Sequence, residues 1–336
     1  MSQINILSNF FMECKTFFMV FLVSMVYFGL FYYNDTRGKC SENQSSKGDA
    51  MPNTITYTIF LPNLPENFKP FRIVHLSDLH GREFGGQNCL LLDSVRNLNP
   101  DLIVMSGDMV NGGQKSCDVQ GRQNFLKLCR TLSTLCPVLY SLGNHELELP
   151  DSRLAVWTEK VRRTGVTVLD NQSIDIMHDT VRFPVFGLTM PLLYYKDPLK
   201  KPYNRKANWT CKDMERIFGS LSVSNSKSAG PSILLAHNPL YFPAYRDWGA
   251  ALTFSGHVHG GIIRLPLIGG VLSPDLSLFP NYDGGLFSEY SSMDNSHTPR
   301  QMIVSRGLSD TFLKRIFNPM EIVCAVICPK TNSSRC

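Results

Sequence analysis

Two histidines separated by one residue stand in the stretch SGHVHGG at 255–261. The apolar run at 250–254 predicts a short buried strand, and the glycines that follow it favour a sharp turn with a slim backbone. Histidines at such a turn suit two different partners, or two metal ions lying side by side. Taken alone, His257 and His259 are equally compatible with ordinary loop histidines. The choice depends on what the rest of the chain brings to the same place.

Four more clusters of ligand-type side chains each follow a predicted strand. They are Asp78 and His80 after 71–76, Asp108 after 101–105, Asn144 and His145 after 137–141, and His237 after 232–236. Ligands gather beyond the carboxyl ends of strands in open α/β sheets, so we expect the clusters to converge. Carboxylate, imidazole and amide ligands suit Mn²⁺, Fe²⁺ or Zn²⁺. The set is too large for one ion and fits a two-metal hydrolase, whose ions lie about 3.5–4 Å apart.

The elements that position these clusters alternate between strands and helices in the first half of the chain. Further strands are predicted at 54–60, 166–169, 172–177, 181–188, 262–265, 301–305 and 321–327, and helices at 88–97, 123–135 and 151–163. Continuous apolar strands that alternate with helices indicate buried sheets covered by helices, hence an α/β fold. His75 lies inside a strand and is predicted to be a packed or edge histidine.

Five sequence motifs resemble the calcineurin-like metallophosphoesterase family over about 71–327. In chain order they are D-x-H, G-D, G-N-H-E, A-H-N-P and S-G-H-V-H-G-G. The resemblance implies a four-layer α/β/β/α sandwich with two divalent metal ions. It implies that Asp78, His80 and His259 bind one ion, that Asp108 bridges both, and that Asn144, His237 and His257 bind the second.

The resemblance gives His145 a different role. It implies that this imidazole donates to the phosphoryl group or protonates the leaving oxygen, as a general acid. Glu146 stands where the family often has Asp and is expected to orient His145. Asn111 stands where many members carry Asp, and no ligand role is assigned to it. Arg306 is expected to contact the substrate phosphate.

The N-terminal region contains an uncharged apolar run long enough to span a bilayer. No small-residue cleavage site follows the run, which favours an uncleaved anchor over a signal peptide. The predicted parts are a tail at 1–15, a transmembrane anchor at 16–33, a polar linker at 34–53 and a metallophosphoesterase domain at 54–330. More basic residues follow the run than precede it, and basic excess marks the cytoplasmic side. We therefore predict a single-pass inner-membrane protein with a cytoplasmic catalytic domain.

Composition narrows the class of partner. The formal net charge is +5 with no densely basic face or tail, so no nucleic-acid partner is predicted. The stretch at 192–231 is long and basic, with interleaved aromatic residues. It is either a solvated surface insertion or a lid that meets a phosphate or a lipid. The ten cysteines are scattered without a C-x-x-C pair, and several stand in apolar runs, so most are predicted to be reduced and buried.

Two more segments narrow the substrate. Together with the predicted anchor, two segments resemble the membrane-anchored bacterial branch of the family: GGIIRLP at 260–266 and RIFNPMEI at 315–322. Within that branch, the chain is most similar in size and layout to the UDP-2,3-diacylglucosamine pyrophosphatases of lipid A synthesis. The resemblance implies hydrolysis to UMP and 2,3-diacylglucosamine 1-phosphate at the membrane, with Mn²⁺ as the first choice of metal. Ile262 replaces a Gln common in that branch, which leaves a substrate contact there open.

Two alternatives remain. One is a phosphodiesterase or phosphomonoesterase that acts outside the membrane on another envelope phosphate. The other is a non-catalytic scaffold with the same fold. Every position matched to a family ligand carries a residue able to bind metal, which disfavours the scaffold.

Overall fold

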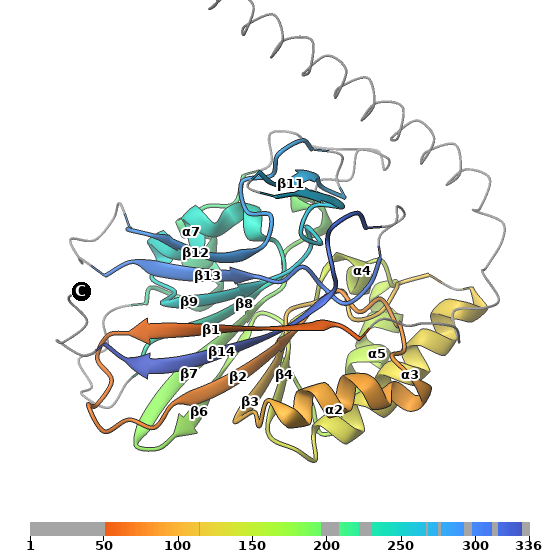
Figure 1. The fold of residues 1–336 in the computed structure, drawn as a ribbon, viewed down its shortest axis with the longest axis horizontal. Helices are drawn as coiled ribbons and strands as arrows, with labels where there is room; N and C mark the ends of the chain where they lie inside the picture. The colour runs from red at the N-terminus through yellow and green to blue at the C-terminus, as the bar shows by residue number, and fades with distance from the viewer. Residues whose placement is uncertain are drawn as a thin grey trace, which may run out of the picture. The chain divides into compact units, whose positions relative to one another are not determined.

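The structure is a computed structural model, and Figure 1 shows its fold. It describes residues 51–113, 115–195, 208–221, 230–266, 268–274, 277–291, 298–310 and 315–330. The predicted anchor, most of the predicted linker and the basic centre of the predicted insertion lie outside these ranges. Among the helices that are described, none has the length and apolar character needed to cross a bilayer. All described residues belong to one unit, 44–336.

Two six-stranded sheets, both mixed, form the centre of this unit. Sheet A contains, in spatial order, β1 (Asn53–Leu61), β14 (Glu321–Pro329), β2 (Phe71–Leu76), β3 (Leu102–Met105), β4 (Val138–Tyr140) and β5 (Thr167–Val168). Sheet B contains β12 (Gly285–Glu289), β13 (Arg300–Val304), β9 (Leu252–Ser255), β8 (Ile233–Ala236), β7 (Val181–Leu188) and β6 (Gln172–His178). A separate antiparallel pair consists of β10 (Ile263–Leu265) and β11 (Gly269–Leu272).

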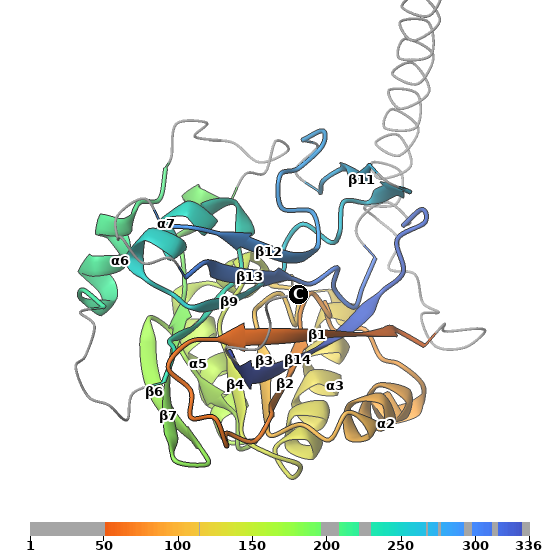
Figure 2. The same ribbon diagram turned by 60° about the vertical axis from the view of Figure 1, so that its left-hand side comes forward.

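Helices cover the outer faces of both sheets (Figures 1 and 2). Those on sheet A are α2 (Cys89–Asn97), α3 (Ser116–Leu132) and α5 (Asp151–Arg162), and those on sheet B are α6 (Cys211–Phe218) and α7 (Phe242–Trp248). The short helix α4 (Asn144–Leu147) follows β4 directly, and single 3₁₀ turns lie at η1 (Gly86–Asn88), η2 (Leu192–Tyr194) and η3 (Pro239–Tyr241).

Three apolar cores hold these layers together. The core between the sheets contains Phe71, Leu102 and Val104 from sheet A, packed with Phe183, Val185, Ile233 and Phe254 from sheet B. A second core packs α2, α3 and α5 on sheet A, and a third packs α6 and α7 on sheet B. The predicted four-layer α/β/β/α order is therefore confirmed. Cys129 and Cys324 are buried in the second core, whereas Cys89 is exposed.

The predicted strands agree closely with the structure, whereas β11, β12 and some helices were not predicted or differ in extent. The strands β3, β8 and β9 are buried at every position, as continuous apolar runs require. The helix α3 begins at Ser116, seven residues before the predicted start at 123, because its first turns are polar and Asp118 accepts the Lys115 N–H as a cap. The helix α7 was not predicted, since Pro243 near its start reads as a loop signal.

The fold brings the predicted ligand clusters to one place. The strands β2, β3 and β4 run parallel, and so do β8 and β9 in the other sheet. Each of these strands ends in one of the clusters, so the carboxyl ends of both sheets present their loops to a common point. This convergence is what the rule for α/β sheets predicts.

The core between the sheets gives a direct test of the layered packing. Phe183 is fully buried, with its ring centroid 5.1 Å from that of Phe71. We predict that Phe183→Ala lowers the free energy of unfolding by about 3–5 kcal/mol, because it leaves a cavity between two sheets that cannot collapse. Met177→Ala, at an exposed position of the neighbouring edge strand β6, is the control and should change it by less than about 0.5 kcal/mol. Denaturant unfolding followed by near-UV circular dichroism measures both, and equal values would contradict the packing described.

Candidate metal centre

The backbone turns sharply at most of the predicted ligands. Five of them have left-handed conformations: Asp78 (φ 53°), His80 (φ 49°), Asp108 (φ 52°), His257 (φ 69°) and His259 (φ 50°). Such conformations are uncommon outside glycine, although Asp and His adopt them more readily than most residues. Their concentration at one point is typical of a functional site, where the surrounding structure holds strained residues in place.

Close backbone contact holds two of these loops against each other. Gly107 has φ 112°, and a Cβ there would lie 2.6 Å from the backbone nitrogen of Gly143. The loops after β3 and β4 therefore touch at two glycines. Their contact places the side chain of Asp108 against the start of α4, where Asp108 Oδ1 accepts the backbone N–H of His145 at 2.8 Å.

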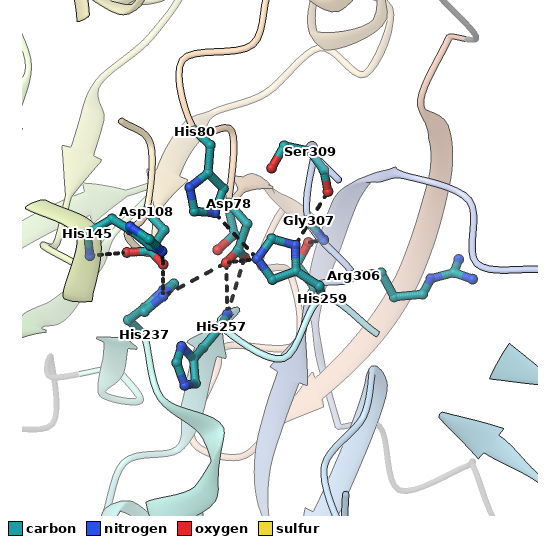
Figure 3. A network of polar contacts seen from close by, with 12 residues as sticks. Asp78, His80, Asp108, His145, His237, His257, His259, Arg306, Gly307 and Ser309 are labelled. Atoms are coloured by element: carbon teal, nitrogen blue, oxygen red, sulfur yellow. Dashed lines mark hydrogen bonds and ion pairs between the residues drawn. The ribbon is translucent and has the colours of Figure 1, made fainter. Parts of the chain in front are cut away.

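One group of ligand atoms consists of Asp78, His80 and His259. The Nε2 atoms of the two histidines face each other at 3.4 Å, and His259 Nε2 lies 3.3 Å from Asp78 Oδ1. Asp78 also accepts the backbone N–H of His257, at 3.1 Å. Figure 3 shows these side chains pointing at one another from loops of both sheets. Three donor atoms around one small space are suited to a divalent ion.

A second group consists of Asp108, His237 and His257. His237 Nε2 lies 3.0 Å from Asp108 Oδ2, and the imidazole rings of His237 and His257 have centroids 5.3 Å apart. Asp108 also forms a group with His80 and His145. It therefore lies between the two groups, in the position expected for a bridging carboxylate.

Two hydrogen bonds fix which imidazole nitrogen faces the centre. His237 Nδ1 donates a hydrogen bond to the carbonyl of Ser106 at 2.9 Å. His80 Nδ1 donates one to Asn111 Oδ1 at 2.8 Å. Each bond leaves Nε2 available for a metal, as partners of metal-binding histidines usually do. Asn111, to which no ligand role is assigned, thus has a supporting role that the sequence did not reveal.

One buried oxygen, Asn144 Oδ1, lacks a hydrogen-bond partner among the described residues. Buried polar atoms without partners are rare in folded proteins, and an ion is one of the explanations for them. Oxygen and imidazole donors in this arrangement fit two divalent ions of the Mn²⁺, Fe²⁺ or Zn²⁺ type. The assignment of individual ligands to each ion stays a prediction.

Burial and neighbouring charges shift the pKa values of Asp78 and Asp108 in opposite directions. Burial, reinforced by the charge of Asp108, raises the pKa of Asp78 to about 6. Burial also acts to raise the pKa of Asp108, but His237 and His145 hold it well below its usual range. Asp108 is therefore ionised throughout the neutral range, as a bridging ligand must be.

The pKa values of the histidines are also shifted in opposite directions. Burial lowers the pKa of His80 to about 4 and that of His259 well below its usual value. Burial opposes protonation of His237 as well, but Asp108 raises its pKa to about 9. A metal ligand must be neutral imidazole, so metal binding at His237 has to displace this proton.

His145 differs from the other histidines in its surroundings. Its side chain is 33% exposed, and its Nδ1 lies 3.5 Å from Glu148 Oε2, one helical turn further along. Although burial lowers its pKa, the charges of Asp108 and Glu148 raise it to about 9, so the ring carries a proton that it can donate. Glu148 lies beside the ring, and the charge of Glu146 also raises the pKa of His145.

Glu146 also has a structural role, which was not expected from the sequence. It is fully buried and accepts the backbone N–H groups of Asp108 at 2.9 Å, Val110 at 3.1 Å and Gly143 at 2.8 Å. It therefore ties the loop after β3 to the loop after β4. The signal for Glu148 was its i+3 spacing from His145, which places both on one helix face.

Arg306, predicted to contact substrate, points away from the cluster (Figure 3). Its Nε donates to Glu321 Oε2 at 2.5 Å, and its backbone N–H donates to Oε1 of the same residue at 2.9 Å. Glu321 is buried and requires a cationic partner, which Arg306 supplies. The structure thus brings six of the seven predicted metal ligands together, and His145 with them, but leaves Arg306 outside: the six are Asp78, His80, Asp108, His237, His257 and His259.

Two residues at the centre were not foreseen from the sequence. Arg315 places a guanidinium nitrogen 3.2 Å from His259 Nδ1, while its Nε donates to the carbonyl of Ser309 at 2.9 Å. Burial lowers its pKa to about 10, so it remains charged at neutral pH. The ring of Tyr195, from the predicted insertion, lies 5.2 Å from that of His257, and its hydroxyl is buried without a partner among the described residues.

The family can now be identified. A family model described as calcineurin-like phosphoesterase matches residues 71–261, more than half of the chain. The chain belongs to the calcineurin-like phosphoesterase family. The resemblance noted from the five sequence motifs is thereby confirmed, and the match contains every predicted metal ligand.

Three relatives of this phosphoesterase are informative. Phosphodiesterase YaeI of Escherichia coli (strain K12) is 29% identical over 62% of this chain and 68% of its own length. The uncharacterized metallophosphoesterase YkuE of Bacillus subtilis (strain 168) is 27% identical over 78% of this chain and 80% of its own. UDP-2,3-diacylglucosamine pyrophosphatase LpxG of Chlamydia muridarum (strain MoPn / Nigg) is 23% identical over 82% of this chain and 90% of its own.

The hydrogen bond to His80 yields a prediction about metal affinity. We predict that Asn111→Ala weakens Mn²⁺ binding about 10–100-fold, because the imidazole loses the acceptor that fixes its tautomer. Asn111→Asp keeps an acceptor and should restore the affinity. Asn124→Ala, which removes an amide bonded to Glu83 on the surface of α3, is the control. Calorimetric titration of the metal-free chain measures all three, and undiminished affinity in Asn111→Ala would contradict this role.

His75 yields a prediction about pH. It is buried in β2, and burial together with repulsion from His237 lowers its pKa to about 3, against an ordinary 6.5. Below pH 6.5 the unfolded chain takes up a proton that the folded chain refuses, so this group lowers stability by about 1.4 kcal/mol per pH unit as pH falls. We predict that His75→Asn makes the fall of unfolding free energy with acidification shallower by about that slope in the metal-free chain. Parallel pH profiles for both proteins would contradict it.

Proposed function

We propose that this phosphoesterase hydrolyses the pyrophosphate of UDP-2,3-diacylglucosamine, giving UMP and 2,3-diacylglucosamine 1-phosphate in lipid A synthesis. The observation that carries the proposal is the similarity to the Chlamydia enzyme, which extends over nine-tenths of that protein. The centre built by Asp78, Asp108 and the histidines supports the reaction type, since the family hydrolyses phosphoesters with divalent metal ions. We propose Mn²⁺ as the metal.

The chain's own residues supply the remaining parts of the reaction. When bound, two divalent ions activate a water molecule and neutralise phosphoryl oxygens. Asp108 is ionised and lies between both ligand groups, so it would bind both ions. His145 is protonated, reaches the edge of the centre and is partly exposed, so it donates a proton to the leaving phosphate oxygen as the P–O bond breaks. Glu148 holds the ring in position.

The proposal includes attachment to a membrane. The substrate carries two acyl chains, and the uncharged run at 16–33 is long enough to span a bilayer. The basic residues that follow this run favour a cytoplasmic catalytic domain, which is also where a UDP-sugar is found. We therefore propose a single-pass protein of the bacterial inner membrane.

A second candidate function has its own support. The E. coli relative is named a phosphodiesterase and is more similar to this chain, at 29% identity, than the Chlamydia enzyme. A phosphodiesterase that acts on another envelope phosphate would use the same metal centre. A topology reporter fused to the C-terminus distinguishes the two, because an extracytoplasmic domain has no access to UDP-sugars.

Release of UMP from UDP-2,3-diacylglucosamine tests the proposal. We predict that the full chain with Mn²⁺ releases UMP, and that His145→Ala lowers kcat about 10²–10⁴-fold because the leaving oxygen loses its proton donor. His178→Ala, a histidine on the edge strand β6, should leave kcat unchanged.

Two outcomes would contradict the proposal in different ways. Hydrolysis of an aryl phosphodiester without any UMP release would retain the enzyme class and remove the proposed substrate. Equal UMP release by wild type and His145→Ala would retain the substrate and remove the assigned proton donor.

A further inference from the structure

Large apolar side chains project from the region around β10 and β11. Ile268 is 61% exposed, Leu278 43%, Phe279 52% and Phe317 78%, and we call these four residues the apolar rim. Soluble proteins usually bury such residues or scatter them singly. Figures 1 and 2 both show β11 standing apart from the two large sheets.

The rim residues belong to neighbouring segments. The strand β10 pairs with β11, Ile263 in β10 bridges to Ile316, and Leu272 in β11 bridges to Leu278. Two rim residues also line one groove of about 570 Å³, whose lining is Arg264, Leu265, Pro266, Ile268, Gly269, Asp283 and Phe317. The charges in this groove compensate each other, because Arg264 lies 3.1 Å from Asp283. The rim residues therefore lie on segments that pair with one another, and the groove that two of them line also contains this ion pair.

This surface adjoins the metal centre. Only three residues, 260–262, separate His259 from Ile263, the first residue of β10. Asn318, next to Phe317, donates to the carbonyl of His259 at 2.7 Å and to that of Gly261 at 3.0 Å. The segment that carries Phe317 is thus bonded directly to the loop that carries a predicted metal ligand.

The first strand of the domain begins near the segment that carries Phe317. Asn53, the first residue of β1, donates its backbone N–H to the carbonyl of Met320 at 2.8 Å. Met320 is three residues after Phe317. The apolar run at 16–33 precedes β1 in the sequence by only the polar stretch 34–52.

We propose that the apolar rim docks on a lipid bilayer and holds the metal centre at the membrane surface. The proposal rests on the proposed function, because a diacylated substrate has to be reached from the bilayer. A bilayer suits the surface because exposed Phe, Leu and Ile enter the boundary between headgroups and acyl chains. The proposed membrane anchor at 16–33 would keep the domain close to the bilayer on which the rim docks.

Tryptophan fluorescence in proteoliposomes tests this docking. The native residues Trp157, Trp209 and Trp248 are buried and give a constant background. The variants are Ile268→Trp, Phe279→Trp and Phe317→Trp, each in the full chain reconstituted in phosphatidylcholine vesicles with or without brominated acyl chains. Met177→Trp, equally exposed at 62% on β6, is the matched control.

We expect brominated lipid to reduce the added emission of the rim variants roughly twofold or more, since docked side chains lie about 5–10 Å into the boundary region. The control should not change. Equal emission in both lipids for all rim variants would overturn the proposal. A blue shift of Phe317→Trp that grows with protein concentration and ignores bromination would assign the surface to a second copy of the chain, and would overturn it as well.

The quenching needs no catalytic turnover, so it is separable from the substrate assay. Failure to release UMP with quenching intact would remove the proposed substrate and retain the docking surface. UMP release without quenching would retain the proposed substrate and remove the docking surface.

Discussion

Two carboxylates buried side by side are the constraint on which the site depends. Asp78 and Asp108 are both almost fully buried, and the charge of Asp108 raises the cost of ionising Asp78. Removing such charges from water costs several kcal/mol each unless cations compensate them. Without metal, the proton on His237 supplies part of that compensation. Two divalent ions would supply far more, which explains why a fold tolerates this concentration of charge.

The architecture follows from the need to present these groups at one point. Two sheets packed face to face place the carboxyl ends of β2, β3 and β4 opposite those of β8 and β9. Continuous apolar strands fix the sheets, and the left-handed residues then turn the side chains toward the centre. Glu146 binds the loops after β3 and β4 to each other, so the position of Asp108 depends on a buried carboxylate that touches no substrate.

Much of this was predictable because apolar runs and the ligand types that follow them are local features of the sequence. The strands, the layers and the identity of the clustered residues all follow from such runs. Asn111, Glu148 and Arg315 were missed because their roles depend on side-chain contacts across loops. The ion pair of Arg306 was missed because its partner, Glu321, is 15 residues away. The helix α7 was not predicted because Pro243 near its start is typical of a loop. The apolar rim depends on how β10 and β11 pair with later segments, which the sequence alone does not show.

The central claim is that Asp108 bridges two metal ions, and electron paramagnetic resonance of the Mn²⁺-loaded chain tests it most directly. Ions that share a carboxylate oxygen about 3.5–4 Å apart are magnetically coupled. The account predicts an exchange-coupled multiline spectrum for the wild type that Asp108→Asn replaces with the spectrum of isolated ions. A wild-type spectrum of isolated ions alone, at saturating Mn²⁺, would contradict it.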